Sequence, residues 1–375
     1  MMIDQNFVQN IPEKILMGPG PSTVPARVLS ALSQPTVGHL DPLYIQIMDE
    51  TCEMLRQVYA TKNTFTFPVS ATGMAGMECI ITNLLEAGEE AIVCINGVFG
   101  ARMKDAMERA GVKVHSISKD WGQVFDLNEI KEVIENNPQA KAIGLVHAET
   151  STGALQPHIK EIADLAHDAG MLLLLDTVTS LSGHPVEIDA WGVDASYSGT
   201  QKCLSCPPGL SPITFSDAAI EKIESRKTKV QSWYFDISML REYYSGSGKR
   251  AYHHTAPVNM VYALRESLMI VLEEGLEARF KRHEEAHLRL KKGLMDMGIS
   301  YIPENSLHTL NCVSIPDGVD DAKVRGKLMS DYGIEIGPGL GAFAGKAWRI
   351  GLMGSTATKK NVDLVLAALK DCMSA

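Results

Sequence analysis

Short apolar runs alternate with amphipathic, helix-like stretches through the first two thirds of the chain. The strand-like runs cover residues 91–95, 112–117, 142–146, 172–176, 195–198 and 213–215. Between them, residues 126–136 open with an Asp cap, and residues 158–169 place apolar side chains at helical spacing before Gly170, as in helices with a defined start and stop. This alternation predicts an α/β fold with a mostly parallel sheet between helices. Ligands of such sheets bind beyond the carboxyl ends of the strands.

The pattern changes after residue 257. A long, charge-rich helical pattern covers residues 257–297 and tolerates Gly275, and strand-like or helical patterns follow at 310–315, 322–332, 347–352 and 361–372. This order predicts a smaller α+β domain. We therefore expect three parts: an extended arm at 1–21, a large ligand-binding domain at 22–257 and a small C-terminal domain at 258–375.

Composition and charge exclude several classes of protein function. The chain has 375 residues, of which 45% are hydrophobic and 21% are charged, as in ordinary globular proteins that bury a sizeable core. A net charge of −10 argues against nucleic-acid binding, which needs a basic face. No apolar run approaches the ~18 residues of a membrane span, and residues 1–10 lack the features of a secretory signal. The seven cysteines then suggest free thiols, so we expect a cytoplasmic protein with no membrane partner.

A lysine and an aspartate follow two neighbouring predicted strands. Lys202 ends the segment Ser198-Gly199-Thr200-Gln201-Lys202, and Asp176 ends the apolar run 172–176. A single lysine is usually exposed, but a buried strand-end aspartate needs a cationic partner. A lysine could be that partner, and so could a protonated pyridine nitrogen. Pyridoxal phosphate requires both residue types, a lysine that bonds the cofactor and a carboxylate at the pyridine nitrogen.

Two further segments fit a phosphorylated, planar ligand. Residues 70–78, rich in Gly, Ser and Ala, follow a strand-like run at 65–69 and open a helix, where main-chain N–H groups can approach a phosphate. Phe99 follows the run 91–95 and could stack on a ring. Each segment also has a plainer interpretation, since small residues open many helices and Phe99 could simply belong to the core.

In this order, the segments resemble the class V branch of fold-type I pyridoxal-phosphate enzymes, and within it the alanine–glyoxylate and serine–pyruvate aminotransferases. The resemblance spans nearly the whole chain and implies a seven-stranded sheet in the large domain. The matching segments are Met17-Gly18-Pro19-Gly20-Pro21-Ser22, Gly38-His39-Leu40-Asp41-Pro42, His147-Ala148-Glu149-Thr150-Ser151-Thr152-Gly153, the Asp176 strand, 197–202 with Pro207-Pro208-Gly209, Tyr252-His253-His254-Thr255-Ala256-Pro257 and Trp348-Arg349-Ile350-Gly351-Leu352-Met353-Gly354.

The resemblance also implies roles for single residues. Lys202 would bond the cofactor and then carry a proton between the substrate α-carbon and the cofactor, while Asp176 would keep the pyridine nitrogen protonated. The remaining cofactor contacts would come from Phe99 and Val178 on the two ring faces, Thr150 near the ring hydroxyl, and Thr72, Gly73, Met74 and Gln201 at the phosphate. Some relatives have tryptophan, histidine and serine in place of Phe99, Met74 and Thr150. These departures could change cofactor affinity but leave the chemistry intact.

Substrate and subunit contacts follow from the same resemblance. Arg349 would bind the substrate carboxylate through two parallel hydrogen bonds, and Gly20 would lie beside the substrate. Tyr252 and Thr255 would reach the phosphate of a partner subunit, which implies a homodimer with shared sites. We therefore expect transamination from a small amino acid, alanine or serine, to a small 2-oxo acid, with glyoxylate as the leading acceptor.

Several alternatives stay open at this point. A (S)-ureidoglycine–glyoxylate aminotransferase is a close relative, and an inactive structural relative would have lost Lys202, Asp176 or Arg349. A cysteine desulfurase needs a histidine where Phe99 stands. The segment His283-Glu284-Glu285-Ala286-His287 matches the zinc-peptidase pattern H-E-x-x-H, but its charged neighbours favour a solvated helix face, so we expect no metal. Cys203 and Cys206 lack a second pair for zinc and are expected to pack behind Lys202.

Overall fold

The computed structural model describes residues 8, 10–244 and 250–374. The first seven residues and Gln9 of the predicted arm lie outside the described residues. Within the described part, no helix combines the length and the apolar character that crossing a bilayer requires.

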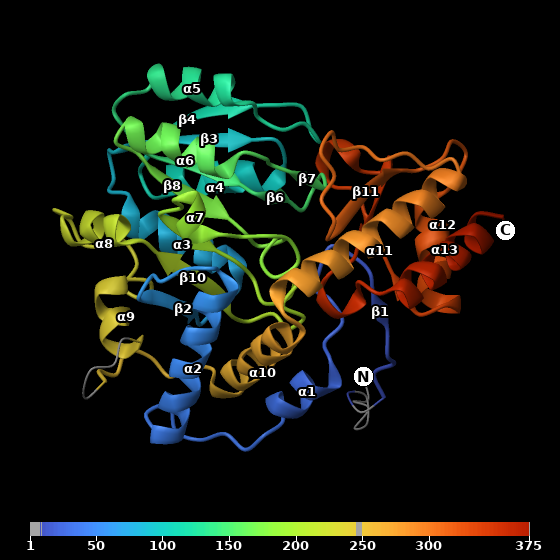
Figure 1. The fold of residues 1–375 in the computed structure, drawn as a ribbon, viewed down its shortest axis with the longest axis horizontal. Coiled ribbons are helices and arrows are strands. Elements are labelled where there is room, and N and C mark those ends of the chain that lie inside the picture. Colours follow the sequence, from blue (N-terminus) through green and yellow to red (C-terminus); the bar gives the residue numbers. More distant parts are fainter. Residues whose placement is uncertain (1–7, 9, 245–249, 375) are drawn as a thin grey trace, which may run out of the picture.

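A seven-stranded sheet forms the centre of the larger part of the molecule (Figure 1). Its strand order is β2-β10-β9-β8-β5-β3-β4, and only β10 runs antiparallel to its neighbours. The bounds are β2 Phe65–Val69, β3 Glu90–Ile95, β4 Lys113–Ser118, β5 Ala140–Val146, β8 Leu172–Asp176, β9 Ala195–Tyr197 and β10 Ser211–Phe215. The prediction of a mostly parallel seven-stranded sheet is therefore confirmed, and the strands lie within three residues of their predicted limits.

Helices cover this sheet and share one hydrophobic core with it. They are α1 Ala26–Leu32, α2 Pro42–Val58, α3 Gly73–Leu84, α4 Val98–Arg109, α5 Leu127–Glu135, α6 Ile159–Asp168, α7 Ile188–Trp191, α8 Asp217–Glu224, α9 Ile237–Tyr244 and α10 Val258–Glu274. Local chemistry fixes several ends. Asp126 and Glu129 form a capping box at the start of α5, and Gly170, with a φ of 72°, follows the end of α6.

A second core lies beside the first and is built on a small sheet (Figure 1). The sheet has the order β11-β14-β13, and a two-stranded parallel pair joins β1 to β12. The bounds are β1 Ile15–Leu16, β11 Leu310–Ser314, β12 Ile334–Glu335, β13 Gly337–Pro338 and β14 Ala347–Gly351, with α11 Leu276–Asp296, α12 Asp321–Asp331 and α13 Lys359–Ser374. A two-stranded pair, β6 Ala148–Glu149 with β7 Ala154–Leu155, lies where the two parts meet.

The predicted single helix over 257–297 is wrong. Gly275 has a φ of 80°, outside the helical region, so α10 ends at Glu274 and α11 begins at Leu276. The side chains of α10 pack in the larger core, whereas those of α11 reach the smaller one. The domain limits 1–21, 22–257 and 258–375 stay a prediction.

Candidate active site

Asp176 lies buried at the carboxyl end of β8, opposite Tyr197 on β9. The Tyr197 hydroxyl donates to Asp176 Oδ2 at 2.5 Å, and the Val178 amide donates to Oδ1 at 2.8 Å. Burial raises the pKa of Asp176 to about 7, although both hydrogen bonds act to lower it. A cation beside this carboxyl group would offset the cost of burying its charge. Tyr197 received no role from the sequence, although its place at the end of a buried strand opposite Asp176 could have indicated one.

Lys202 is 7% exposed and lies in the turn that follows β9. Burial, and then the nearby charge of Arg349, lower the pKa of Lys202 to about 8, so a substantial fraction of the amine is neutral near that pH. A neutral amine can attack a carbonyl carbon. The Ser22 hydroxyl donates to the Lys202 carbonyl at 2.7 Å, which ties the N-terminal segment to this turn.

Gly20 closes over the amine. Its φ is 101°, which favours glycine, and a Cβ at this position would lie 2.7 Å from Lys202 Nζ and push the amine aside. The Lys202 ammonium also donates to the Pro19 carbonyl. The structure therefore brings the predicted substrate residue Gly20 to Lys202.

Arg349 comes from β14 of the small sheet and is 5% exposed. Its Nε donates to the Pro338 carbonyl at 2.8 Å and its Nη1 to the Thr150 carbonyl at 3.2 Å. Burial lowers the pKa of Arg349. Arg349 and Lys202 are thus two buried cationic groups close enough to affect each other's charge, an arrangement that favours an anionic substrate group between them.

The start of α3 offers a binding place for an anion. No side chain caps the helix at Thr72, so the main-chain N–H groups of its first turn are not satisfied by a cap. A Cβ on Gly73 would lie 3.6 Å from Val178 Cγ2, which places this turn next to the segment after Asp176. Gln201 Oε1 is buried without a hydrogen-bond partner in the described residues. The free main-chain N–H groups at the start of α3 are donors that suit a phosphate, and the nearby Gln201 amide could add a donor by turning its Nε2 towards it.

Phe99, in the first turn of α4, is held through a carboxylate to which the sequence analysis assigned no role. The completely buried Glu149 accepts hydrogen bonds from the Phe99 and Gly100 amides at 3.1 and 3.3 Å and from the Ser151 hydroxyl at 2.6 Å. Burial raises the pKa of Glu149. A carboxylate shortly after the apolar run 142–146 was the signal that could have pointed to it.

The other predicted residues are less closely joined to Lys202. The Thr150 hydroxyl bonds the Thr179 hydroxyl, and Met74 is partly buried at the edge of the large core. Tyr252 is 62% exposed, and its hydroxyl lies 3.5 Å from the Thr255 hydroxyl. Both residues face solvent in this single chain.

The H-E-x-x-H segment lies on α11, and only one side of this helix faces solvent. His283 and His287 are buried, in contrast to the expectation, because they point into the protein while Glu284 and Glu285 stay exposed. The His283 Nε2 atom accepts from the Gly354 amide at 3.0 Å, and His287 Nδ1 bonds Asn311 Oδ1 at 2.6 Å. Across residues 8, 10–244 and 250–374, no group of His, Cys, Asp and Glu has the arrangement of a metal site.

The pair Cys203 and Cys206 is buried, as expected. Burial raises the pKa of the Cys203 thiol to about 11, so it is protonated near neutral pH and unreactive. Cys206 packs in the larger core, and Cys203 packs with Ala148, Leu155, Leu307, Leu310 and Met353.

Comparison with known proteins identifies the family. Residues 15–365 match the family described as Aminotransferase class-V. The chain belongs to the class V aminotransferases. It is 39% identical over 380 residues to the (S)-ureidoglycine–glyoxylate transaminase of Bacillus subtilis, with 96% of this chain and 90% of the relative covered. It is 40% identical over 368 residues to the alanine–glyoxylate aminotransferase of Callithrix jacchus, with 97% and 88% covered.

Solved structures agree. The alanine–glyoxylate aminotransferase of Nostoc sp. superposes with a TM-score of 0.94 at 45% identity, covering 99% of this chain and 100% of that one. Class V aminotransferases of this fold depend on pyridoxal phosphate, so this aminotransferase uses that cofactor. The residues present fit it: a buried carboxyl group of raised pKa, a buried amine of lowered pKa, and a helix start whose N–H groups no side chain caps.

Proposed function

We propose that this aminotransferase moves the amino group of a small amino acid, alanine or serine, to glyoxylate. The observation that carries the proposal is the convergence of Lys202, Asp176 and Arg349 from two sheets. Both relatives described above have glyoxylate in their names. The covering of Lys202 by Gly20 also favours a small substrate.

Different residues of the chain would bind the cofactor, move the proton and orient the substrate. When bound, pyridoxal phosphate supplies an electron sink for the substrate α-carbon. Lys202 Nζ would hold the cofactor and, once free of it, would hold the proton that leaves the substrate α-carbon. Asp176 would keep a proton at the pyridine nitrogen, and Arg349 would orient the substrate carboxylate. Phe99 and Val178 would enclose the two faces of the ring and exclude water.

The remaining cofactor contacts are proposed for the phosphate and the ring hydroxyl. Gln201, Thr72, Gly73 and Met74 would hold the phosphate, and Thr150 would lie near the ring hydroxyl. Tyr252 and Thr255 would contact the cofactor phosphate bound in a partner subunit. Both side chains are exposed in this chain, and their hydroxyl groups lie side by side. We accordingly propose a homodimer. We also propose a cytoplasmic location, which suits seven free, buried thiols.

A second candidate is (S)-ureidoglycine as the amino donor. It is favoured by the 39% identity to the Bacillus subtilis enzyme. The donor differs from alanine and serine only in its side chain, so Lys202, Asp176 and Arg349 would act in the same way on all three.

A donor panel separates the two candidates. The purified, cofactor-loaded enzyme is incubated with glyoxylate and, in turn, alanine, serine and (S)-ureidoglycine, and glycine formation is followed. We expect kcat/KM for alanine or serine to exceed that for ureidoglycine by about tenfold or more, a transition-state difference of ~1.4 kcal/mol. The reverse order would establish the second candidate. Lys202→Ala is the control and should form no glycine with any donor.

A further inference from the structure

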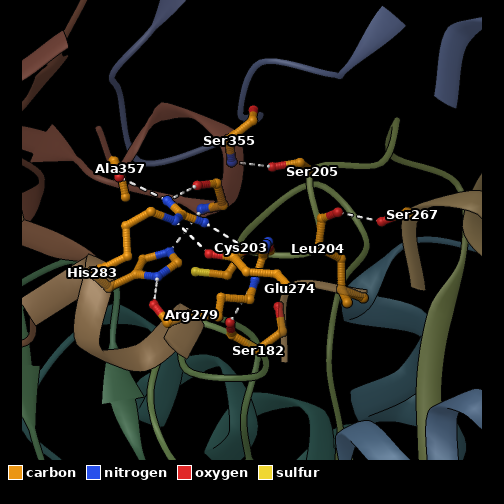
Figure 2. Close-up of polar contacts among 12 residues, drawn as sticks. Ser182, Cys203, Leu204, Ser205, Ser267, Glu274, Arg279, His283, Ser355 and Ala357 are labelled. Atoms are coloured by element: carbon orange, nitrogen blue, oxygen red, sulfur yellow. Dashed lines mark hydrogen bonds and ion pairs between the residues drawn. The ribbon is translucent and has the colours of Figure 1, made fainter. Parts of the chain in front are cut away.

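A buried arginine joins the two loops that follow the active-site strands. Arg279, in the first turn of α11, has a side chain that is 3% exposed. Its Nε donates to the Ser182 carbonyl at 2.9 Å and its Nη2 to the Cys203 carbonyl at 2.6 Å (Figure 2). Ser182 belongs to the loop after Asp176, and Cys203 directly follows Lys202. One rigid, planar group therefore spans the segments that hold the carboxylate and the amine.

Both of these loops contain a residue in an unfavourable backbone conformation. Ser182 has a φ of 65° and Ser205 a φ of 54°, in the left-handed region that side chains other than glycine rarely adopt. Such conformations persist only where surrounding contacts hold them. Arg279 holds the first through the Ser182 carbonyl, and the Ser355 amide holds the second through Ser205 Oγ at 2.9 Å.

The same network continues to the loop that follows β14, the strand of Arg349. Glu274, the last residue of α10, accepts from Arg279 Nη1 at 2.6 Å and from Arg282 Nε at 2.6 Å. Arg282 Nη1 in turn donates to the Gly354 and Ala357 carbonyls at 2.9 and 2.7 Å. Charge-assisted hydrogen bonds of this kind are stronger than neutral ones and more restrictive in direction.

His283 completes the connection. Its Nδ1 donates to the Arg279 carbonyl at 2.7 Å, and its Nε2 accepts from the Gly354 amide at 3.0 Å. Only a neutral ring can do both, and burial lowers the pKa of His283 to about 3. The first histidine of the H-E-x-x-H segment thus links the main chain at Arg279 to the main chain at Gly354 (Figure 2).

We propose that Arg279 is a positioning residue for amino transfer. By joining the loops after β8 and β9, it sets the distance between the Lys202 amine and the Asp176 carboxylate. Through Glu274 and Arg282, it also sets Arg349 relative to both. The inference rests on the proposed function, because it concerns the same site, but it adds a residue that touches neither cofactor nor substrate.

The test compares two identical substitutions on one helix. Arg279→Lys keeps the charge and the ion pair with Glu274 but cannot span both carbonyls. Arg289→Lys is the matched control, since Arg289 also lies on α11 in an ion pair, with Asp363, and is 44% exposed. Melting temperature, cofactor content, the pH dependence of the visible absorption of the bound cofactor, kcat and KM are measured for both and for the wild type.

We expect kcat per cofactor-loaded Arg279→Lys enzyme to fall by about tenfold or more, as for other small misplacements of reacting groups. The pH midpoint of the cofactor absorption should move by about half a unit or more, because the spacing of Lys202 and Asp176 affects the charge of each. Arg289→Lys should change neither quantity. A lower melting temperature with unchanged kcat and pH midpoint would show a merely structural role and overturn the proposal.

A second variant covers the case in which Arg279→Lys does not fold. Glu274 is 26% exposed, and Glu274→Gln weakens the hold on both arginines without emptying the buried site. It should lower kcat severalfold and move the absorption midpoint in the same direction, and wild-type values would refute the inference. If the wild type transfers no amino group to glyoxylate, the proposed function fails, whereas the absorption midpoint still decides the role of Arg279.

Discussion

At the scale of single residues, the site depends on groups whose charge state is displaced by burial. Burial raises the pKa of Asp176 to about 7 and lowers that of Lys202 to about 8. Each group therefore changes its charge much closer to neutral pH than the same side chain would in water. The sequence predicted these two residues because each follows a buried strand. It did not predict Tyr197 and Glu149 as supports, because their partners depend on strand register and on a contact across 50 residues.

Asp176→Asn is expected to keep the cofactor and lose most of the rate. An amide cannot balance the charge of a protonated pyridine, and a hydrogen bond to a charged group contributes roughly 1.5–3 kcal/mol, which corresponds to about tenfold to a hundredfold in rate or more. The rate of a single half-reaction is measured by stopped-flow absorbance. Asp194→Asn is the control: this carboxylate is also buried, but it bonds His167 and the Leu173 amide, so its loss should reduce stability and spare the rate.

Arg349→Lys is expected to raise KM for both the amino donor and the oxo acceptor. Lysine keeps the charge but loses the second parallel hydrogen bond, at a cost of about tenfold in KM for each ~1.4 kcal/mol. Cofactor binding should hardly change. Melting temperature and both KM values are measured on one preparation, and unchanged KM with a lower melting temperature would assign Arg349 to structure alone.

At the scale of elements, the patterns predicted the strands well and the junction between α10 and α11 poorly. Short apolar runs flanked by turn residues are typical of buried strands in a chain where strands alternate with helices. A glycine inside a long helical pattern is ambiguous, because only the backbone angle decides whether it continues or ends the helix. The sequence could not predict the contacts of Arg279 for another reason. They join residues 97 and 76 positions apart, and nothing local in α11 indicates which carbonyl groups it meets.

Gly275→Ala tests the junction. Nothing lies within 4 Å of a Cβ at this position, so the only penalty is the positive φ, and we expect a loss of roughly 1–2 kcal/mol in the free energy of unfolding. Gly326→Ala is the matched control, because Gly326 lies within α12 and also has free space around a Cβ. It should instead stabilise by up to ~1 kcal/mol. Urea unfolding measures both, and equal effects would contradict the assigned break.

At the scale of the whole molecule, neutral histidines are built into the interior. Burial lowers the pKa of seven of them: to about 4 for His184, His254 and His287, to about 3 for His283, well below the usual value for His147, and below it for His253 and His308. The rings of His147, His184, His308 and His287 form a continuous row of contacts between the two parts of the molecule. Protonation of these histidines at acid pH should therefore destabilise the contacts between the two parts of the molecule.

The cofactor-free protein is expected to lose stability as the pH falls from about 6.5 towards 4. In this range, the unfolded chain binds protons at these histidines and the native state does not, so each contributes a loss of ~1.4 kcal/mol per pH unit. The raised pKa values of Asp176 and Glu149 act in the opposite direction but involve only two groups. Urea unfolding at several pH values measures the slope. His184→Asn should reduce it, and His158→Asn, at a side chain 55% exposed, should not.

The placement of Met17 has a consequence for the order in which the chain can fold. Met17 is completely buried in the smaller core, its carbonyl accepts from the Gly351 amide at 2.7 Å, and the neighbouring β1 pairs with β12. This segment is therefore synthesised long before the residues that it pairs with. Until residue 351 leaves the ribosome, Met17 cannot make its native contacts. The following residues, including Gly20, then cannot take up their position over Lys202. The active site can therefore close only after residue 351 has been made, and a product that stops before this residue would remain catalytically silent.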